Sequence, residues 1–545
     1  MLLLLQGRRA TARVIFQNRK RKSNLNMSDI AEIPLSERAI IIHSEDNVAI
    51  AKTAIGLGTV LRLNGTRILL CQTVQPGHKI ALRSIAQGQP VVRYGQVIGL
   101  ATENIPQGGT VHVHNMTIDS LRRQYDSCSA FKPVQFFSGS DLPKFRGYVR
   151  DWGGVGTRNY VAVLSTVICS SHPTNLIGRH FETLFKGDPN FDGVIAITHQ
   201  EGCGGEKGED MAQLLRMYHG IMYHPNVAGI LVLGLGCEES NVDCLQGCSS
   251  GLPLRLQNNT KDRVRYLTVQ GAGGTTRTVQ QGTKIVEELV EKAREHRRSE
   301  LPASEIVLGL NCGGSDAYSG ISANPALGHA SDLLVRCGGT TVLPETPEIY
   351  GAEHLLIRGA STPKAAEDLL KIIERYKRYV GAMGGTLDDN PAPGNKAGGI
   401  SNIVEKSLGA ILKAGSTPLN AVVDYAEPVK SKGFVIMDSP GYDTPSVSGL
   451  VSGGANLVCF TTGRGTPTGN PIVPVIKIAT NSRMYHHMEE NMDINAGTII
   501  DGEESLEQVG KRIFDKMLSV ASGERAKNEI TGHREFAIWR TGPML

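Results

Sequence analysis

The sequence predicts an α/β protein in which a small β-rich N-terminal domain precedes two α/β domains with Rossmann-like, mostly parallel sheets. Short alternating apolar runs fill residues 36–117, strands alternate with helices from Gly147 to about Arg298, and a second such series begins after Leu301. Strands separated by helices favour βαβ units and parallel pairing. A chain of 545 residues is also long enough for several domains, each with its own core.

Composition and charge narrow the class of protein. Hydrophobic residues make up 40% and charged residues 20% of the chain, as in an ordinary globular protein. No apolar stretch reaches the roughly eighteen residues needed to cross a bilayer, so a membrane is not an expected partner. The ten cysteines are scattered through a chain too large to need disulfides, which favours reduced thiols and a cytoplasmic location.

Residues 1–35 are predicted to be a disordered basic leader. Residues 1–28 hold seven Arg or Lys and no acidic residue, and without these seven the formal net charge of +4 becomes −3. The body of the protein is therefore slightly acidic, and nucleic acid is not an expected partner. A mitochondrial presequence is the alternative to a disordered tail or to a true start at Met27.

Residues 36–117 are expected to form a β-rich domain, either a small barrel or a clamp. Its short runs are separated by Gly, Pro and Asn turn signals. The runs are residues 39–51, 59–65, 66–74, 79–85, 90–101 and 110–116. Residues 118–145 contain Pro133, Gly139 and Pro143 and are predicted to be a linker.

The two α/β domains are predicted to span residues 146–300 and 301–545. The first ends in a strongly charged helix over 278–298. In the second, strands are expected near 305–310, 340–343, 434–438, 456–461 and 475–479, with helices at 363–380 and 400–413.

Four predicted strands run into short loops that each carry a cysteine, namely Cys169, Cys203, Cys237 and Cys312. Ligands of α/β sheets bind beyond the carboxyl ends of the strands, and glycines in these loops let a ligand approach the backbone. Thiolates suit iron, zinc or an iron–sulfur cluster. Any one cysteine alone is more typical of a small buried hydrophobe, but at least two of these four are predicted to share a metal site.

Three histidines are candidates for a site. His199 shares the strand-end loop of Cys203 and is a candidate general base or metal ligand, although a surface histidine explains it equally well. His43 and His78 are candidates for an oxygen and nitrogen metal site in the N-terminal domain. Histidines on an exposed strand face are the plainer explanation of that pair.

Glycine-flanked charged residues mark candidate substrate contacts. Arg464 lies in TTGRGTP and Lys396 in PGNKAGG. A guanidinium in a glycine loop can bind a carboxylate through two hydrogen bonds. Arg158 in VGTRN and Asp316 in CGGSDAYSG are similar polar groups beside strands or turns.

Glu345 and Glu348 follow the strand predicted at 340–343. Both are candidate metal ligands or acid–base groups, although carboxylates at a helix start are also explained by the helix dipole.

The sequence argues against several other chemistries. GLGCEE at 234–239 and GAGGTTR at 271–277 each lack a glycine of the dinucleotide-binding fingerprint. The Arg464 and Lys396 loops do not have P-loop spacing, and no G-x-S-x-G nucleophile elbow occurs.

Longer motifs spread along the chain point to one family. HSEDNVAIA, PGHKIAL and VVRYGQVIG occur near the N-terminus, and VGTRN, HPNVAGILVLGLGCE, CGGSDAYSGISANPALG, PGNKAGGI, EKSLG, TTGRGTP and IKIATN follow. The first three resemble the SAF-like domain of the altronate and galactarate dehydratases, and the others resemble the rest of that family. The resemblance covers about residues 38–545 and implies a SAF-like domain fused to the dehydratase body.

This resemblance implies a sugar-acid dehydratase that requires Fe²⁺ or a similar divalent metal such as Mn²⁺. Such an enzyme removes water from a 2,3-dihydroxy acid and leaves a 2-keto-3-deoxy acid. An iron–sulfur cluster remains open as an alternative to a single ion. The positions that match the family pattern are His43, Asp46, His78, His199, Cys203, Cys237, Cys312, Asp316, Lys396, Arg464 and Lys477.

The roles assigned to these residues come from their chemistry. His199, or otherwise Lys396, is predicted to remove the C2 proton, with Asp316 and Glu348 as further catalytic candidates. Substrate-binding residues are predicted to be Arg158, Arg464 and Lys477. Metal ligands are predicted among Cys169, Cys203, Cys237, Cys312, His43 and His78.

Altronate is the expected small-molecule substrate, and 2-dehydro-3-deoxygluconate and water are the expected products. The enzyme is also expected to be a homo-oligomer. The alternatives are a galactarate dehydratase and a sulfolactate sulfo-lyase-like enzyme, in which the SAF-like part is usually a separate chain. A non-catalytic sugar-acid-binding protein is the alternative from a different class.

Overall fold

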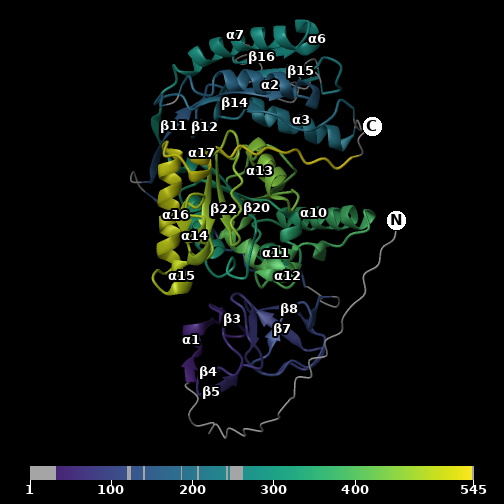
Figure 1. The fold of residues 1–545 in the computed structure, drawn as a ribbon, viewed down its shortest axis with the longest axis vertical. Helices are drawn as coiled ribbons and strands as arrows, with labels where there is room; N and C mark the ends of the chain where they lie inside the picture. The colour runs from purple at the N-terminus through teal and green to yellow at the C-terminus, as the bar shows by residue number, and fades with distance from the viewer. Residues whose placement is uncertain are drawn as a thin grey trace, which may run out of the picture.

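The computed structural model describes residues 32–118, 124–138, 142–185, 187–204, 208–240, 244–245 and 262–542. Residues 1–31 of the predicted leader therefore lie outside the described residues, and so do parts of the predicted linker. An N-terminal β domain, a middle α/β domain and a C-terminal α/β domain follow one another along the chain. The C-terminal domain lies between the other two (Figure 1). These sheets confirm the predicted fold class.

Three small sheets build the N-terminal domain, with strand orders β1-β4-β5, β2-β3-β6-β9 and β10-β8-β7. Its elements are β1 (Glu32–Pro34), α1 (Leu35–Arg38), β2 (Ala39–Ile40), β3 (Val48–Ala51), β4 (Val60–Leu63), β5 (Thr66–Leu69), β6 (Lys79–Ala81), β7 (Pro90–Arg93), β8 (Gln96–Ala101), β9 (Thr110–Val111) and β10 (Met116–Thr117). Because β1 pairs with β4, ordered structure begins before residue 36, where the sequence placed the start of this domain.

Two tight turns in this domain follow from local sequence. Asn64 and Gly65 join β4 to β5 with φ of 48° and 82°, as a two-residue type I′ hairpin requires. Tyr94 and Gly95 join β7 to β8 with φ of 62° and 66°. A Cβ on Gly320 of the C-terminal domain would meet the Tyr94 hydroxyl, so this second turn packs closely against that domain.

The middle domain has a parallel four-stranded sheet in the order β14-β13-β15-β16. Its elements are β13 (Tyr160–Ser165), α2 (Ile168–His180), β14 (Gly193–Ile197), α3 (Glu209–Met222), β15 (Val227–Gly234), β16 (Val264–Thr268), α6 (Val269–Ala272) and α7 (Thr275–Ala293). Strands β13 and β15 are buried along their whole length, as expected for parallel strands covered on both faces. Helices α2 and α7 pack on one face and α3 on the other.

The C-terminal domain is organised around a parallel seven-stranded sheet in the order β20-β21-β19-β18-β22-β23-β24. The strands are β18 (Val307–Cys312), β19 (Thr340–Leu343), β20 (Leu419–Val423), β21 (Gly433–Met437), β22 (Leu457–Thr462), β23 (Val475–Ala479) and β24 (Ile494–Asn495). The helices are α8 (Ala323–Arg336), α9 (Glu353–Arg358), α10 (Pro363–Ala382), α11 (Pro393–Ala397), α12 (Ile403–Ala410), α13 (Asp443–Ser452), α14 (Ser482–His487), α15 (Thr498–Asp501), α16 (Leu506–Ala521) and α17 (Lys527–Thr531).

Helices cover both faces of this sheet. Helices α8 and α16 pack together over one face, whereas α13 covers the other and contacts α3 of the middle domain. Strand β11 (Lys144–Val149) begins inside the predicted linker and pairs with β12 (Val155–Gly156) and with β17 (Ser299–Pro302). No helix in the described ranges is long and apolar enough to cross a membrane.

A buried ion-pair network joins the N-terminal domain to α12. Lys79 Nζ donates to both carboxylate oxygens of Glu405 at 2.9 Å and to the carbonyl of Gly399 at 2.9 Å. Arg93 also pairs with Glu405 and donates to the carbonyl of Ala317 at 2.6 Å. All three charged side chains are buried, so the interface between the two domains excludes solvent at this point.

Candidate active site and metal centre

The carboxyl edge of the seven-stranded sheet holds the candidate site. Strand β18 ends at Cys312, and the short 3₁₀ helix Thr346–Glu348 follows β19. Asp443 begins α13 after β21, and Arg464 follows β22. A pocket of about 410 Å³ opens here and is lined in part by Glu348, Asp443 and Arg464. Ligands of parallel sheets bind at this edge.

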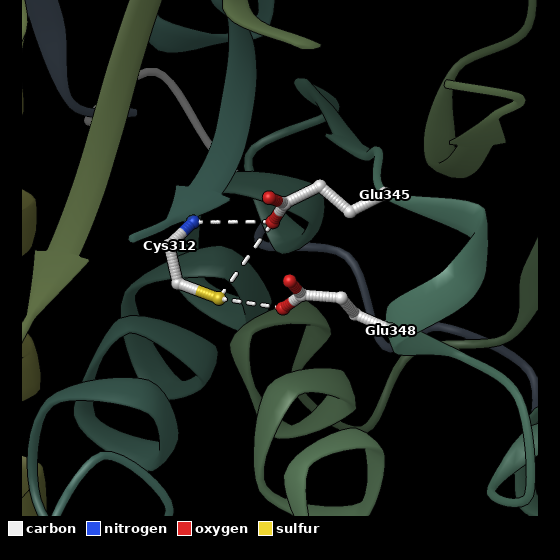
Figure 2. A group of neighbouring side chains, drawn as sticks. All are labelled: Cys312, Glu345 and Glu348. Carbon is white, nitrogen blue, oxygen red and sulfur yellow. Dashed lines mark hydrogen bonds between the residues drawn. The ribbon is translucent and has the colours of Figure 1, made fainter. Parts of the chain in front are cut away.

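The side chains of Cys312, Glu345 and Glu348 point toward one another (Figure 2), and Glu348 also lines the pocket. The Cys312 Sγ lies 3.4 Å from Glu348 Oε2 and 3.6 Å from Glu345 Oε2, and the Cys312 backbone N–H donates to Glu345 Oε2 at 3.3 Å. One ligand atom from each residue lies within 4.8 Å of the others, and all three residues are buried. Among the residues that the structure describes, no other group of His, Cys, Asp and Glu meets this criterion.

Two lysines balance the negative charge of the group. Lys413 Nζ lies 2.7 Å from Cys312 Sγ and 3.6 Å from Glu345 Oε2. Lys406 Nζ donates to Glu348 Oε1 at 2.6 Å. Removing one partner of such buried pairs leaves an uncompensated charge, which is strongly destabilising.

The two carboxyl groups respond to this environment in opposite ways. Burial, and after it the carboxylate of Glu348, raise the pKa of Glu345 to about 8. Burial would also raise the pKa of Glu348, but the ammonium groups of Lys406 and Lys413 bring it below its ordinary value. Burial raises the pKa of the Cys312 thiol. Like charges held at short distance push the pKa values of such a pair apart.

These residues fit a divalent cation. Glu345 Oε1 is buried without a hydrogen-bond partner in the structure, so this carboxylate has an unused acceptor. Glu345 also has φ of 69°, a left-handed conformation that a non-glycine residue adopts at a cost of about 1–3 kcal/mol and that is typical of functional sites. A thiolate with two carboxylates suits iron, zinc or manganese.

The pocket wall adds a carboxylate and a guanidinium. A Cβ on Gly313 would clash with the Asp443 carboxylate, so only glycine allows this close approach. Burial, and after it the charge of Glu348, raise the pKa of Asp443 to about 6. Arg464 is exposed, and its backbone N–H donates to the carbonyl of Gly314 at 2.8 Å, which fixes its loop against that of Cys312.

The structure does not gather the four thiols that the sequence grouped. Cys312 is buried in the C-terminal sheet, whereas Cys169, Cys203 and Cys237 are exposed at the strand ends of the middle domain. The structure therefore groups Cys312 with Glu345 and Glu348, and not with the other three thiols, which follow strands of a different sheet.

Arg158 has a structural role in place of the predicted substrate contact. Its guanidinium pairs with both carboxylate oxygens of Glu529 at 2.7 Å and donates to the carbonyls of Thr157, Val520 and Glu524. A guanidinium has five N–H donors, and all five are used within the protein.

His199 is likewise held inside the middle domain and not in the pocket. Its Nε2 lies 2.8 Å from the Ser165 carbonyl and 3.0 Å from the Tyr218 hydroxyl, and its Nδ1 accepts from the Glu201 N–H at 3.1 Å. Burial lowers the pKa of His199 to about 4. With both ring nitrogens engaged, His199 is not placed to remove a substrate proton here.

Asp316 is engaged in a similar way, although it sits near the pocket. Its carboxylate accepts from Thr480 Oγ1 at 3.0 Å and from the backbone N–H groups of Tyr318 and Ser319 at 3.1 and 3.0 Å. It thereby ties two loops together and is not free for catalysis.

The remaining predicted residues lie around the site without forming it. Lys396 follows the lining residue Asn395 on α11 but does not itself line the pocket. Lys477 is buried beneath the Phe460 ring, with Nζ 3.4 Å from the ring centroid, and burial lowers its pKa to about 7. Neither lysine touches the pocket as the sequence had suggested.

The two N-terminal histidines do not form a metal group in the described structure. His43 is exposed, and its Nδ1 accepts from the Glu45 N–H at 3.2 Å. His78 Nε2 lies 3.4 Å from the carbonyl of Ala397, so it contacts the α11 segment.

Sequence reasoning missed Lys406, Lys413 and Asp443. The two lysines lie seven residues apart in the predicted helix 400–413 and share one face of it, which is the signal that could have found them. Asp443 follows a predicted strand end within PGYDTP, and no residue pattern marks it as facing Gly313.

Comparison with known proteins identifies the class. Residues 37–119 match the altronate/galactarate dehydratase SAF domain, residues 147–294 the second domain of D-galactarate dehydratase/altronate hydrolase, and residues 303–544 the C-terminal D-galactarate/altronate dehydratase domain. The chain therefore belongs to the altronate and galactarate dehydratase family, whose enzymes are hydro-lyases.

Individual relatives are similar over nearly the whole length. Altronate dehydratases of Bacillus subtilis (strain 168) and Escherichia coli (strain K12) are each 36% identical, over 93% of this chain and 99% of the relative. Galactarate dehydratase (L-threo-forming) of E. coli is 35% identical over 93% of this chain and 97% of the relative.

Proposed function

We propose that this protein dehydrates altronate to 2-dehydro-3-deoxygluconate in the pocket beside Cys312, Glu345 and Glu348. The observation that carries the proposal is a pocket at the sheet edge lined by Glu348, Lys406 and the exposed Arg464. Glu348 also belongs to the buried group with Cys312 and Glu345, which Lys413 contacts. The reaction itself comes from the names of the relatives.

The pocket suits a small polyhydroxy acid. Its volume of about 410 Å³ lies in the range of small-molecule sites. We assign the substrate carboxylate to Arg464, which can bind it through two hydrogen bonds. Asn390 and Asn395 line the same pocket, and each side-chain amide keeps one N–H and one acceptor position beyond its bonds within the protein. We assign these groups to the substrate hydroxyls.

Asp443 is our choice for the base that removes the C2 proton. Its pKa of about 6 leaves it ionised at neutral pH while keeping it close to the operating pH, where general bases work best. Protonated Asp443 then returns this proton to the C3 hydroxyl, which leaves as water. The resulting enol gains a proton at C3 and loses the proton of its C2 hydroxyl, which gives the 2-keto acid.

Lys406 stabilises the negative charge that develops on the substrate carboxylate. Its ammonium lines the pocket, and its salt bridge to Glu348 holds it in place before the reaction, so little reorganisation is needed. Cys312, Glu345 and Glu348 would hold a divalent cation, which we propose to be Fe²⁺ or Mn²⁺. When bound, such a cation supplies a Lewis acid that polarises a substrate oxygen.

Galactarate is the second candidate substrate, because the galactarate dehydratase relative is almost as similar as the altronate enzymes. The sulfolactate sulfo-lyase alternative, the cytoplasmic location and the homo-oligomeric state stay predictions.

A substrate panel tests the proposal. Protein loaded anaerobically with Fe²⁺ or Mn²⁺ is incubated with hexonates, hexarates and sulfolactate, and 2-keto-3-deoxy product is measured. We expect turnover of altronate above all others. Turnover of galactarate alone, or of sulfolactate alone, would reject the substrate assignment.

Cys312→Ser tests the location of the site. Loss of a ligand that contacts both carboxylates should reduce turnover at least about tenfold, together with the Mn²⁺ bound by protein loaded with Mn²⁺ alone, as changes around a metal site commonly do. The matched control is Cys337→Ser, which alters another buried thiol at the end of α8 and should keep both. Full activity of Cys312→Ser would move the active site elsewhere.

A further inference from the structure

A second edge that carries thiols lies in the middle domain. Cys169, Cys203 and Cys237 follow β13, β14 and β15, which are neighbours in the order β14-β13-β15. The carboxyl ends of parallel strands meet at one edge of a sheet, so the three loops share that edge. All three cysteines are exposed, although cysteine is among the residue types most often buried.

Backbone hydrogen bonds tie these three loops to one another. The Ile168 N–H donates to the carbonyl of Glu201 at 2.8 Å, and the Glu239 N–H donates to the carbonyl of Cys203 at 3.0 Å. Cys169 is therefore one residue, and Cys237 two residues, from a direct bond to the loop of Cys203.

Buried side chains hold the same loops from beneath. His199 Nε2 bonds to the carbonyl of Ser165 at 2.8 Å and links the loop after β14 to the end of β13. The Glu238 carboxylate accepts from Thr166 Oγ1 at 2.7 Å and from the Cys237 N–H at 3.0 Å, which links the loop after β15 to the end of β13. A satisfied polar network of this kind makes its surroundings rigid. The loops that carry the three exposed thiols are therefore held in fixed positions relative to one another.

We propose that this edge binds a [4Fe–4S] cluster through the thiolates of Cys169, Cys203 and Cys237 and leaves one iron without a protein ligand. Iron–sulfur clusters in proteins are held by cysteine thiolates. His199 and Glu238 act as positioning residues for two of the three loops. The proposal is independent of the function assigned to the Cys312 pocket, which lies in a different sheet.

The described structure does not hold the three sulfurs as close together as a single metal ion needs. Within the described residues, these three sulfurs do not form a ligand group within 4.8 Å of one another. A tetrahedral ion with metal–sulfur bonds of about 2.3 Å needs sulfurs about 3.8 Å apart. In a cluster each thiolate binds a different iron, so the sulfurs stand farther apart.

Iron and acid-labile sulfide analysis tests the proposal. The full chain is purified anaerobically and reconstituted with Fe²⁺ and sulfide, and both elements are measured per chain together with the visible absorption spectrum. We expect about four sulfides per chain for the natural protein, from the cluster stoichiometry. The Cys169→Ser/Cys203→Ser/Cys237→Ser variant should lose more than about nine-tenths of the sulfide. Cys71→Ser, an exposed thiol of the N-terminal domain, should keep it.

Three results would overturn the proposal: no sulfide in the reconstituted natural protein, full sulfide in the triple variant, or iron bound at these thiols without sulfide. His199→Gln should lower the sulfide content while its far-ultraviolet circular dichroism stays unchanged; an unchanged content would remove His199 from the positioning role.

Alkylation gives a second measurement that does not depend on a variant folding. Mass spectrometry after iodoacetamide treatment should show Cys169, Cys203 and Cys237 protected in the reconstituted protein and modified in the apo protein. Cys71 should be modified equally in both, and equal modification of the other three would contradict the cluster. Cys312→Ser should keep its acid-labile sulfide whether or not it keeps activity. Sulfide content therefore tests the cluster proposal, and the activity of Cys312→Ser tests the proposed active site separately.

Discussion

At the scale of single residues, the candidate site concentrates charge that an ordinary core avoids. Cys312, Glu345, Glu348, Lys406 and Lys413 are all buried or nearly so, and each contacts a partner of the opposite character. Glu345 additionally holds a positive φ. Buried charge and backbone strain lower stability and persist where the surrounding structure fixes them, as at active sites.

Asp443→Asn provides the residue-scale prediction. Turnover should fall at least about a hundredfold, because a general base contributes on the order of 10²–10⁴ in rate. In the natural protein kcat should rise with pH through about 6, since Asp443 must lose its proton to act as a base. The charged groups that influence Asp443 are Glu348, Lys477, Lys406 and Lys413.

The measurement is a pH profile of kcat for both proteins. Asp443→Asn should lack the acidic limb in its residual activity. A natural profile that is flat from pH 5 to 7 would remove Asp443 from the proposed role.

At the scale of elements, the segment from α12 to Ala414 serves two interfaces at once. Lys406 and Lys413 reach the metal-ligand group, whereas Glu405 faces the N-terminal domain and pairs with Lys79 and Arg93. Adjacent positions on a helix point about 100° apart, so neighbouring residues can serve different partners. One short segment therefore contacts the N-terminal domain and also carries both lysines that contact the metal-ligand group.

Acid unfolding should report the Glu405 network. Burial would raise the pKa of Glu405, but the charges of Lys79 and Arg93 lower it to about 2 from an ordinary 4.5. A carboxyl group with a depressed folded-state pKa stabilises the protein above its unfolded pKa, and this stability is lost as pH falls toward the folded pKa. The contribution is on the order of 3 kcal/mol and should disappear between about pH 4.5 and 2.

Glu405→Gln tests this effect by chemical unfolding at pH 7 and pH 3. The variant should be less stable than the natural protein at pH 7, and the difference should shrink at pH 3. A difference that grows toward low pH would contradict the assignment. Glu367→Gln, on the exposed side of α10, is the control and should change little at either pH.

At the scale of the whole molecule, the N-terminal domain is a docked unit that shares its interior with the C-terminal domain. Ile85 and Ile98 belong to the same hydrophobic core as Leu408 of α12. The Lys79 and Arg93 pairs cross the same boundary. The middle domain lies at the opposite end of the molecule (Figure 1), so the two small domains contact different parts of the C-terminal domain.

This architecture predicts that the chain can be divided after the N-terminal domain. Residues 32–118 and 124–545, produced together as two chains, should co-purify, because the shared core and buried ion pairs are retained. Size-exclusion chromatography with one tagged piece measures the association. Introducing Glu405→Gln into the larger piece should weaken it, and two pieces that never associate would show that covalent linkage is required.

Local pattern was sufficient for most elements. Strands β19 and β23 match the predicted ranges 340–343 and 475–479, and α10 extends the helix predicted at 363–380 by two residues. The helix predicted at 400–413 is α12 followed by a 3₁₀ turn. Strands β20 and β24 were not predicted: Asn420 interrupts the apolar run of β20, and β24 has only two residues.

The site was only partly predictable. Strand-end position found Cys312, and the sequence named Glu345 and Glu348 as candidate ligands. It could not show that Cys312 meets these two glutamates in preference to the other three cysteines. Arg158 and His199 were assigned to substrate binding and catalysis because polar side chains in glycine-containing loops are often free to bind a ligand. In the structure, partners distant in sequence occupy the hydrogen-bonding groups of both side chains.

The residues alone determined the family, the α/β class and the expectation that the site residues follow the ends of strands, because motifs and periodicity are local properties of the chain. Only the tertiary structure decided which strand ends meet. Sheet order places β18 and β19 side by side and keeps β13, β14 and β15 in another sheet. That order depends on long-range packing of apolar faces, which no local spacing encodes.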